Sequence, residues 1–335
     1  MKKILLSLLG LLIFSLIIFY DSVAYVSKMG YNQIKIVYDA RPIDEILADP
    51  SSPDSLKNRL NFVQEIKQYA FDSLGLNPSE NYTSLYDQHG KAILWNLSAC
   101  KEFEFVAKRW TFPIIGSFPY KGYFDIDDAI AYGKQLKADG WDVRVRSVGG
   151  WSTLGWFKDP ILSNMLDRSD GDLANLIIHE LTHSTLFIKD NIEFNENLAS
   201  FVADQGAIRF LKSRYGETDS LFLDYTSKES DTKKFIDHIL QTANNLDSLY
   251  QSFNAQNLTD TVKRELKQSV INSFINGIDT ISFFNKNRFK ISESFKPNNA
   301  YFMAFRRYNE KQNEFKIEFK RDFNFDFKRY LAYLK

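Results

Sequence analysis

The sequence predicts an α+β protein, with a small α/β region in the first half of the chain and a mostly helical second half. Between residues 80 and 158, short runs of β-branched and aromatic residues surround one helical segment. From Asp172 onward, apolar residues recur at helical spacing almost to the C-terminus. At 335 residues and 44% hydrophobic composition, the chain is long enough to bury a substantial core.

Residues 1–24 predict a membrane anchor or a signal peptide. Two lysines precede an uncharged apolar run from Ile4 to Tyr20, close to the lower limit of about 17 residues for spanning a bilayer. The length of the run favours an uncleaved anchor. The small residues 22–24 offer the alternative, a cleavage site that would release a secreted chain beginning at Tyr25. Either interpretation places the rest of the chain outside the cytoplasm, in the periplasm or at the cell surface.

Residues 25–168 are predicted to form a first subdomain of helices followed by strands. Helices are expected as far as Leu76, in DEILADP and in SPDSLKNRLNFVQEIKQYAFDSLGL. The runs KAILWNLSA, EFEFVA and WDVRVRSV indicate strands, and DIDDAIAYGKQLKADG indicates a helix. After a pair of glycines, WSTLGWF is expected to form another strand, and the following Asp-Pro to begin a helix. Residues 169–335 are predicted to form a helical subdomain.

Composition restricts the classes of ligand. Lys plus Arg and Asp plus Glu both total 42, so the chain has no excess positive charge for nucleic acid, which is excluded as a partner. The single cysteine, Cys100, cannot form an intrachain disulfide or a cysteine-built zinc site. A metal in this protein would therefore need histidine and carboxylate ligands.

Two of the four histidines, His179 and His183, stand four residues apart on the helical run DLANLIIHELTHSTLFI. Side chains at this spacing face the same way about 6 Å apart, so both imidazoles can bind one Zn²⁺ with bonds of about 2.1 Å. Glu180 lies beside them, where a carboxylate can take a proton from the attacking water and pass it to the leaving amine. This pattern predicts a site for one zinc ion per chain in a metallopeptidase.

Spacing also predicts the third ligand. The midpoint between His183 and Glu196 falls in KDN, a stretch of turn composition, and a second helical run follows it. Two antiparallel helices joined there would bring Glu196 level with His183, whereas Glu193 lies nearer the turn. Glu196 is therefore favoured over Glu193.

These residues support a resemblance to a known family. His179-Glu180-x-x-His183 followed by Asn195-Glu196-x-x-Ala199 resembles the zincin metallopeptidases whose third ligand is glutamate. Over about residues 25–310, the chain is similar to the bacterial putative aminopeptidase family, which is usually exported and membrane-attached. The shared segments include ILWNLSA, RWTFPIIGSFPYKGYF, WSTLGWFKDPIL and NNAYFMAFRRYN.

The chain departs from the family at three places. The family typically has two cysteines where Thr111 and Ser117 stand, so a bridge expected there is absent. It usually has a lipoprotein cysteine near the N-terminus, which the apolar run replaces here. Trp151 stands where the family tends to have tyrosine. None of these differences affects the predicted zinc ligands.

The resemblance implies a zincin-like fold, a peptide substrate and further site residues. It implies that an edge strand containing Ser152, Thr153, Leu154 and Gly155 pairs with an extended peptide. It also favours Tyr308 as the hydrogen-bond donor to the oxyanion, with Tyr301 on the same helical face and Asn298 and Asn299 just before it as substrate contacts.

The resulting prediction is a zinc-dependent peptidase, with aminopeptidase activity implied by the resemblance alone. An endopeptidase would share every residue named. A membrane-anchored zincin-fold protein that holds peptides or acts as a scaffold without turnover is a second alternative, and intact Glu180 argues against it. A different metal is a third, less favoured because imidazole and carboxylate ligands at this spacing suit zinc.

Overall fold

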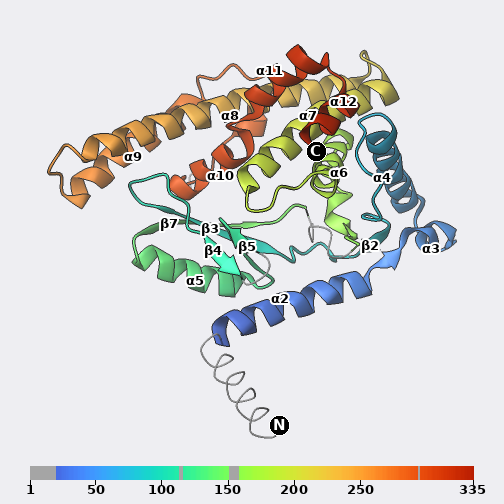
Figure 1. Ribbon diagram of the computed structural model, residues 1–335, viewed down its shortest axis with the longest axis horizontal. Helices are drawn as coiled ribbons and strands as arrows, with labels where there is room; N and C mark the ends of the chain where they lie inside the picture. The colour runs from blue at the N-terminus through green and yellow to red at the C-terminus, as the bar shows by residue number, and fades with distance from the viewer. Residues whose placement is uncertain (1–19, 113–115, 151–157, 293–294) are drawn as a thin grey trace, which may run out of the picture.

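The computed structural model describes residues 20–112, 116–150, 158–292 and 295–335 (Figure 1). Small mixed sheets lie in the first half and helices fill most of the second half, which confirms the α+β prediction. The helices are α2 (Tyr20–Asp39), α3 (Ile43–Ala48), α4 (Asp54–Asp72), α5 (Ile126–Ala138), α6 (Asp170–Thr185), α7 (Ile192–Tyr215), α8 (Ser220–Phe253), α9 (Asp260–Ile278), α10 (Asn299–Asn309), α11 (Gln312–Phe323) and α12 (Phe327–Leu334), with 3-10 turns η1 (Ser163–Met165) and η2 (Lys286–Phe289). The strands are β1 (Arg41–Pro42), β2 (Ser84–Tyr86), β3 (Trp95–Lys101), β4 (Trp110–Phe112), β5 (Gly116–Phe118), β6 (Lys121–Tyr123), β7 (Trp141–Ser147) and β8 (Ile161–Leu162).

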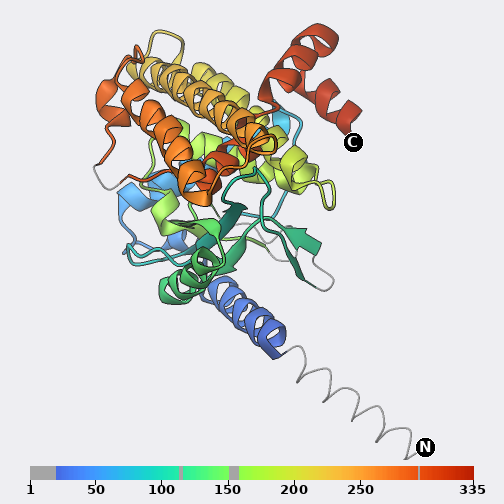
Figure 2. The same cartoon turned by 90° about the vertical axis from the view of Figure 1, so that its left-hand side faces the viewer.

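Helices α2, α3 and α4 occupy the segment before Leu76, where helices were predicted. In Figure 1, α2 runs along the lower side of the molecule, and in Figure 2 the same blue helix extends away from the sheets. Across the described ranges, no helix combines the length and apolar character needed to cross a bilayer. Most of the predicted anchor or signal peptide lies outside those ranges, so it stays a prediction.

The strands form three small sheets. The first sheet has the strand order β6-β3-β7; β3 pairs antiparallel with both neighbours, and β7 lies at an edge. In the order β1-β2-β8, the first pair is antiparallel and the second parallel. The third sheet is the hairpin β4-β5, where Thr111 lies opposite Ser117 and donates a hydrogen bond to it, Oγ1 to Oγ, at 3.3 Å. These are the two positions where the resemblance led us to expect cysteines, and here a hydrogen bond between two hydroxyls joins the strands.

Two elements differ from the sequence prediction. The run EFEFVA forms a turn after β3 with one isolated bridge, between Cys100 and Ala107, because Phe103 and Phe105 pack against the cluster of α8, α9 and α10 instead of pairing as a strand. The helix expected after Pro160 is also absent, because β8 pairs with β2 and only a 3-10 turn follows. The predicted strand WSTLGWF lies outside the described residues.

Three hydrophobic clusters form the core. The largest joins α3, α4, α6, α7, α11 and α12, so it draws on both sides of the predicted boundary at residue 168. A second joins α8, α9 and α10, and a third lies between α5 and the β6-β3-β7 sheet. The elements that carry the histidines therefore pack on helices from both halves of the chain.

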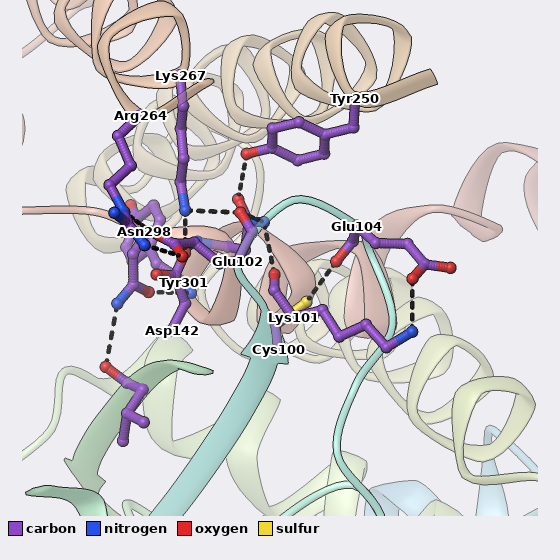
Figure 3. Close-up of polar contacts among 12 residues, drawn as sticks. Cys100, Lys101, Glu102, Glu104, Asp142, Tyr250, Arg264, Lys267, Asn298 and Tyr301 are labelled. Atoms are coloured by element: carbon purple, nitrogen blue, oxygen red, sulfur yellow. Dashed lines mark hydrogen bonds and ion pairs between the residues drawn. The ribbon is translucent and has the colours of Figure 1, made fainter. Parts of the chain in front are cut away.

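A buried polar network fixes the start of α10 (Figure 3). The Asp142 carboxylate accepts hydrogen bonds from Lys267 Nζ at 2.6 Å and from the backbone N–H of Asn299 at 2.8 Å. The Asn298 side chain caps α10 by accepting from the N–H of Tyr301 and donates to the Val143 carbonyl. These contacts hold α10 against the end of β7.

Close packing of α6 on α7 depends on Gly206. A Cβ at this position would lie 2.8 Å from Leu74 Cδ1 and 3.2 Å from two carbons of Ile178, the neighbour of His179. Gly206→Ala is therefore expected to lower the free energy of unfolding by about 1–3 kcal/mol through overpacking. Chemical denaturation of this variant and of Gly30→Ala would measure the effect.

Gly30 is the matched control, because it is also helical but a Cβ there meets nothing within 4 Å. Gly30→Ala is expected to keep or slightly raise stability, since alanine has the higher helix propensity. Equal stability of the two variants would contradict the packing role of Gly206.

Candidate metal centre

The site is built on the antiparallel pair α6 and α7. Helix α6 begins at Ser169, whose side chain accepts a hydrogen bond from the N–H of Asp172, and it buries an apolar face that includes Leu173, Ile177 and Leu181. The loop after Thr185 reverses the chain, and α7 returns from Ile192. Because His179 and His183 lie off the buried stripe, they face α7 across the cavity described below.

Two asparagines on either side of Glu196 hold α7 in place. Asn195 is 1% exposed. Its side chain accepts a hydrogen bond from the N–H of Ile188 and donates one to the Ile188 carbonyl, each at 2.8 Å, which closes the loop between the helices. Asn197 is fully buried, donates to the carbonyl of Arg307 and accepts from the N–H of Lys311. The residues flanking Glu196 thus tie it to the loop and to the end of α10.

Potential metal-ligating atoms of three side chains converge between these helices. Nε2 of His179 lies 3.2 Å from Nε2 of His183, and Oε2 of Glu196 lies 3.4 Å and 3.7 Å from these nitrogens. A tetrahedral ion with bonds of about 2.1 Å holds its ligand atoms about 3.4 Å apart. The group is thus spaced to hold one ion, and no second cluster of this kind occurs in the described part of the chain.

The electrostatics of the group suit a bound cation. Burial opposes the charged form of His179, but the hydrogen bond with Glu196 and the charges of Glu180 and Glu196 outweigh it and raise the pKa of His179. Burial also opposes ionised Glu196, yet hydrogen bonds from both histidines hold the pKa of that carboxyl well below its usual range. An ionised carboxylate beside two imidazoles is the donor set that a divalent metal requires.

Glu180 faces the same cavity from α6. Its Oε1 lies so close to the backbone at Gly150 that a Cβ there would come within 2.5 Å of it. The absence of a side chain at position 150 thus leaves room for the carboxylate. Glu180 is half-buried and does not belong to the three-residue metal group.

Two phenols line the cavity next to this group. The ring of Tyr308 lies 6.4 Å from that of His179, centroid to centroid, and Tyr120 stands in the same cavity. Burial and the charge of Glu196 raise the pKa of both hydroxyls well above the usual range. Both therefore stay protonated at neutral pH and can donate hydrogen bonds.

A half-buried carboxylate on α7 acts on His179. Asp204, on α7, accepts a hydrogen bond from Asn175 Nδ2 at 2.8 Å. Burial raises its pKa to about 6, although the neighbouring Asn175 and the charge of His179 act in the opposite direction. The charge of Asp204 favours the positive form of His179, as expected for a group that supports a metal-binding imidazole.

The cavity has a volume of about 760 Å³, large enough for a short peptide. Its walls come from α2, the β6-β3-β7 sheet, α6, α7 and α10. Met29 of α2, Arg144 of β7 and Tyr308 of α10 all border it. Segments distant in sequence thus enclose one space around the metal group.

In a comparison with known protein families, a family model described as putative aminopeptidase matches residues 24–335. The chain belongs to this aminopeptidase family. No match was found among curated proteins or among solved structures. The predicted resemblance is thereby confirmed, and family membership implies a peptide substrate.

The structure places the other predicted residues of this aminopeptidase family member as follows. Ser152, Thr153, Leu154 and Gly155 lie outside the described residues. Asn298 and Asn299 have partners within the protein: Asn298 caps α10, while fully buried Asn299 donates to the carbonyls of Lys101 and Glu102 and accepts from Tyr250. These contacts explain both asparagines structurally, and their predicted contact with substrate stays a prediction.

Sequence reasoning missed Tyr120 and the arginines of β7. Tyr120 was quoted only within RWTFPIIGSFPYKGYF, and nothing local links it to residues about 60 and 190 positions away. The arginines did leave a signal, because valine and arginine alternate in VRVR. Alternation gives a strand two different faces, and one of them borders the cavity of this aminopeptidase family member.

Metal binding is expected to require Glu196 and not Glu193. The Glu193 side chain is 49% exposed and pairs with Lys311 at 3.3 Å, away from the three converging atoms. Elemental analysis of the purified chain should find one zinc ion per chain in the parent and in Glu193→Ala, and a large loss in Glu196→Ala. Retention of zinc in Glu196→Ala would exclude Glu196 as the third ligand.

Proposed function

We propose that this chain is a zinc-dependent aminopeptidase of zincin-like architecture. The observation that carries the proposal is the spacing of His179, His183 and Glu196, which fits one tetrahedral ion beside Glu180 in a peptide-sized cavity. Two imidazoles and one carboxylate form a zinc set that leaves a fourth position for water or substrate. Family membership supports peptide hydrolysis.

In this proposal, zinc when bound polarises the scissile carbonyl and makes water nucleophilic at neutral pH. Glu180 takes the proton of the attacking water and passes it to the leaving amine. Its place beside Gly150, in the cavity but apart from the metal group, leaves its carboxylate available for this transfer.

A phenol supplies the hydrogen bond to the developing oxyanion. Tyr308 is the proposed donor, because its ring lies 6.4 Å from that of His179 and its hydroxyl stays protonated. A protonated donor that is already in place costs no rearrangement when negative charge develops on the substrate oxygen.

Glu180→Gln tests the proposed chemistry. The amide cannot accept the proton, so kcat on peptides is expected to fall by about 10²–10⁴-fold, whereas zinc content stays that of the parent because Glu180 is not a ligand. A parent that cleaves peptides with a free N-terminus and not their N-acetylated forms would be an aminopeptidase. Cleavage of both forms would indicate an endopeptidase.

The same variant separates the enzyme from a peptide-binding scaffold. If a zinc-loaded parent cleaves no peptide, and Glu180→Gln preserves the biological role, the enzyme proposal fails. Intact Glu180 in the cavity is the observation that favours the enzyme.

The two phenols can be ranked by matched substitutions. Tyr308→Phe is expected to lower kcat by about 10²-fold or more with little change in zinc content, and Tyr120→Phe is expected to lower it less. Steady-state kinetics on one free-N-terminus peptide would measure both. The opposite ranking would assign the donor role to Tyr120.

A further inference from the structure

Strand β7 presents two arginines to the cavity. Arg144 and Arg146 are two residues apart, so they lie on one face of the strand. Val143 and Val145 occupy the other face, which packs on α5: both lie within 4 Å of the place that a Cβ would take at Gly133 of that helix. Both arginines line the cavity that contains the metal group.

These guanidinium groups have no carboxylate partner among the residues that the structure describes. Arg144 lies 5.0 Å above the ring of Tyr301 and is half-buried, and Arg146 is exposed. Several other arginines pair with carboxylates, as Arg264 does with Glu102 at 2.6 Å. Burial lowers the pKa of Arg144, and the charge of Arg146 lowers it further, so an anion placed between them would be favoured by both.

The surroundings add positive charge. Arg168 also lines the cavity, and its Nη2 donates to the Gly149 carbonyl at 3.1 Å. Within the described ranges, the lining has three acidic residues: Asp172 is paired with Lys228, Glu196 belongs to the metal group, and Glu180 also borders the cavity. With a divalent cation bound, the cavity would carry a net positive charge, which concentrates anionic substrates.

The arginines lie near the reaction centre. The charge of Arg146 lowers the pKa of Tyr308 against the effects of burial and Glu196, and the Tyr308 ring is 6.4 Å from that of His179. Interactions between exposed charges are largely screened beyond about 10 Å at about 0.1 M salt, and one extended residue spans about 3.5 Å. A group bound by the arginines would thus stand within about three residues of the scissile bond.

We propose that Arg144 and Arg146 bind a carboxylate of the peptide substrate, within about three residues of the bond that is cleaved. This inference rests on the proposed function and gives it a substrate class. Preferred substrates would be di- and tripeptides with a free C-terminal carboxylate, or longer peptides with an acidic side chain at that place. Guanidinium groups bind carboxylates through paired, charge-assisted hydrogen bonds.

Peptide binding to the full-length, zinc-loaded Glu180→Gln protein tests this proposal without turnover. Calorimetry would measure the affinity for two pairs of peptides. The first pair is trialanine and its C-terminal amide, and the second is Ala-Asp-Ala and Ala-Asn-Ala, both amidated at the C-terminus. In one of the two pairs, the anionic peptide is expected to bind about 10- to 100-fold more tightly than the neutral peptide of that pair. A preference for the free acid identifies the terminal carboxylate as the ligand, and a preference for Asp identifies the side chain.

The variants Arg146→Gln and Arg144→Gln, each combined with Glu180→Gln, should reduce that ratio to about 1. Arg146 gives the decisive result, because it is exposed and its loss removes no packing on Tyr301. Arg321→Gln is the matched control: it lies outside the cavity lining, pairs with Asp322 and should keep the preference. Equal binding of charged and neutral peptides, or a preference that survives both cavity variants, would overturn the proposal.

Kinetics on the unsubstituted parent separate the two proposals. If the parent cleaves neither peptide pair while the binding preference holds, the peptidase function fails and the anion site stands. If it cleaves neutral and anionic peptides with equal kcat/KM and binds them equally, the peptidase function stands and the anion site fails.

Discussion

The close contact between α6 and α7 is the constraint on which the site depends. Helix α6 carries both histidines and α7 carries Glu196, so the separation of the two helix axes sets the distance between the three converging atoms. Gly206 permits that separation, because any side chain there would press on Leu74 and Ile178. A shift of a few tenths of an ångström would spread the donor atoms, and interiors this densely packed transmit such shifts.

The asparagines around Glu196 extend this constraint to the rest of the cavity. Asn195 closes the loop that joins the two helices, and Asn197 holds the end of α10 through the Arg307 carbonyl and the Lys311 N–H. At its other end, α10 is held by Asp142 and Asn298. Buried amides with several fixed partners are costly to rearrange, so Tyr308 is held at a defined place beside His179.

The cavity also depends on the different side chains that β7 carries on its two faces. The valines of β7 complete an apolar cluster with α5, and its arginines line the cavity that contains the metal group. Because β7 pairs with β3 in a fixed register, with Arg144 opposite Ser98 and Arg146 opposite Asn96, the two charges cannot exchange faces with the valines. Burying the apolar face of this sheet therefore places positive charge in the cavity.

The sequence alone determined the features that depend on local periodicity. Helical spacing put His179 and His183 on one face and, with the turn composition of KDN, favoured Glu196; the α+β division followed from the same patterns. Tertiary structure decided what depends on long-range packing: EFEFVA became a turn because its phenylalanines joined the helical cluster, and Tyr120 entered the cavity beside Tyr308. A sequence pattern specifies which face a side chain takes on its own element, but only the packing of elements specifies which distant residues that face meets.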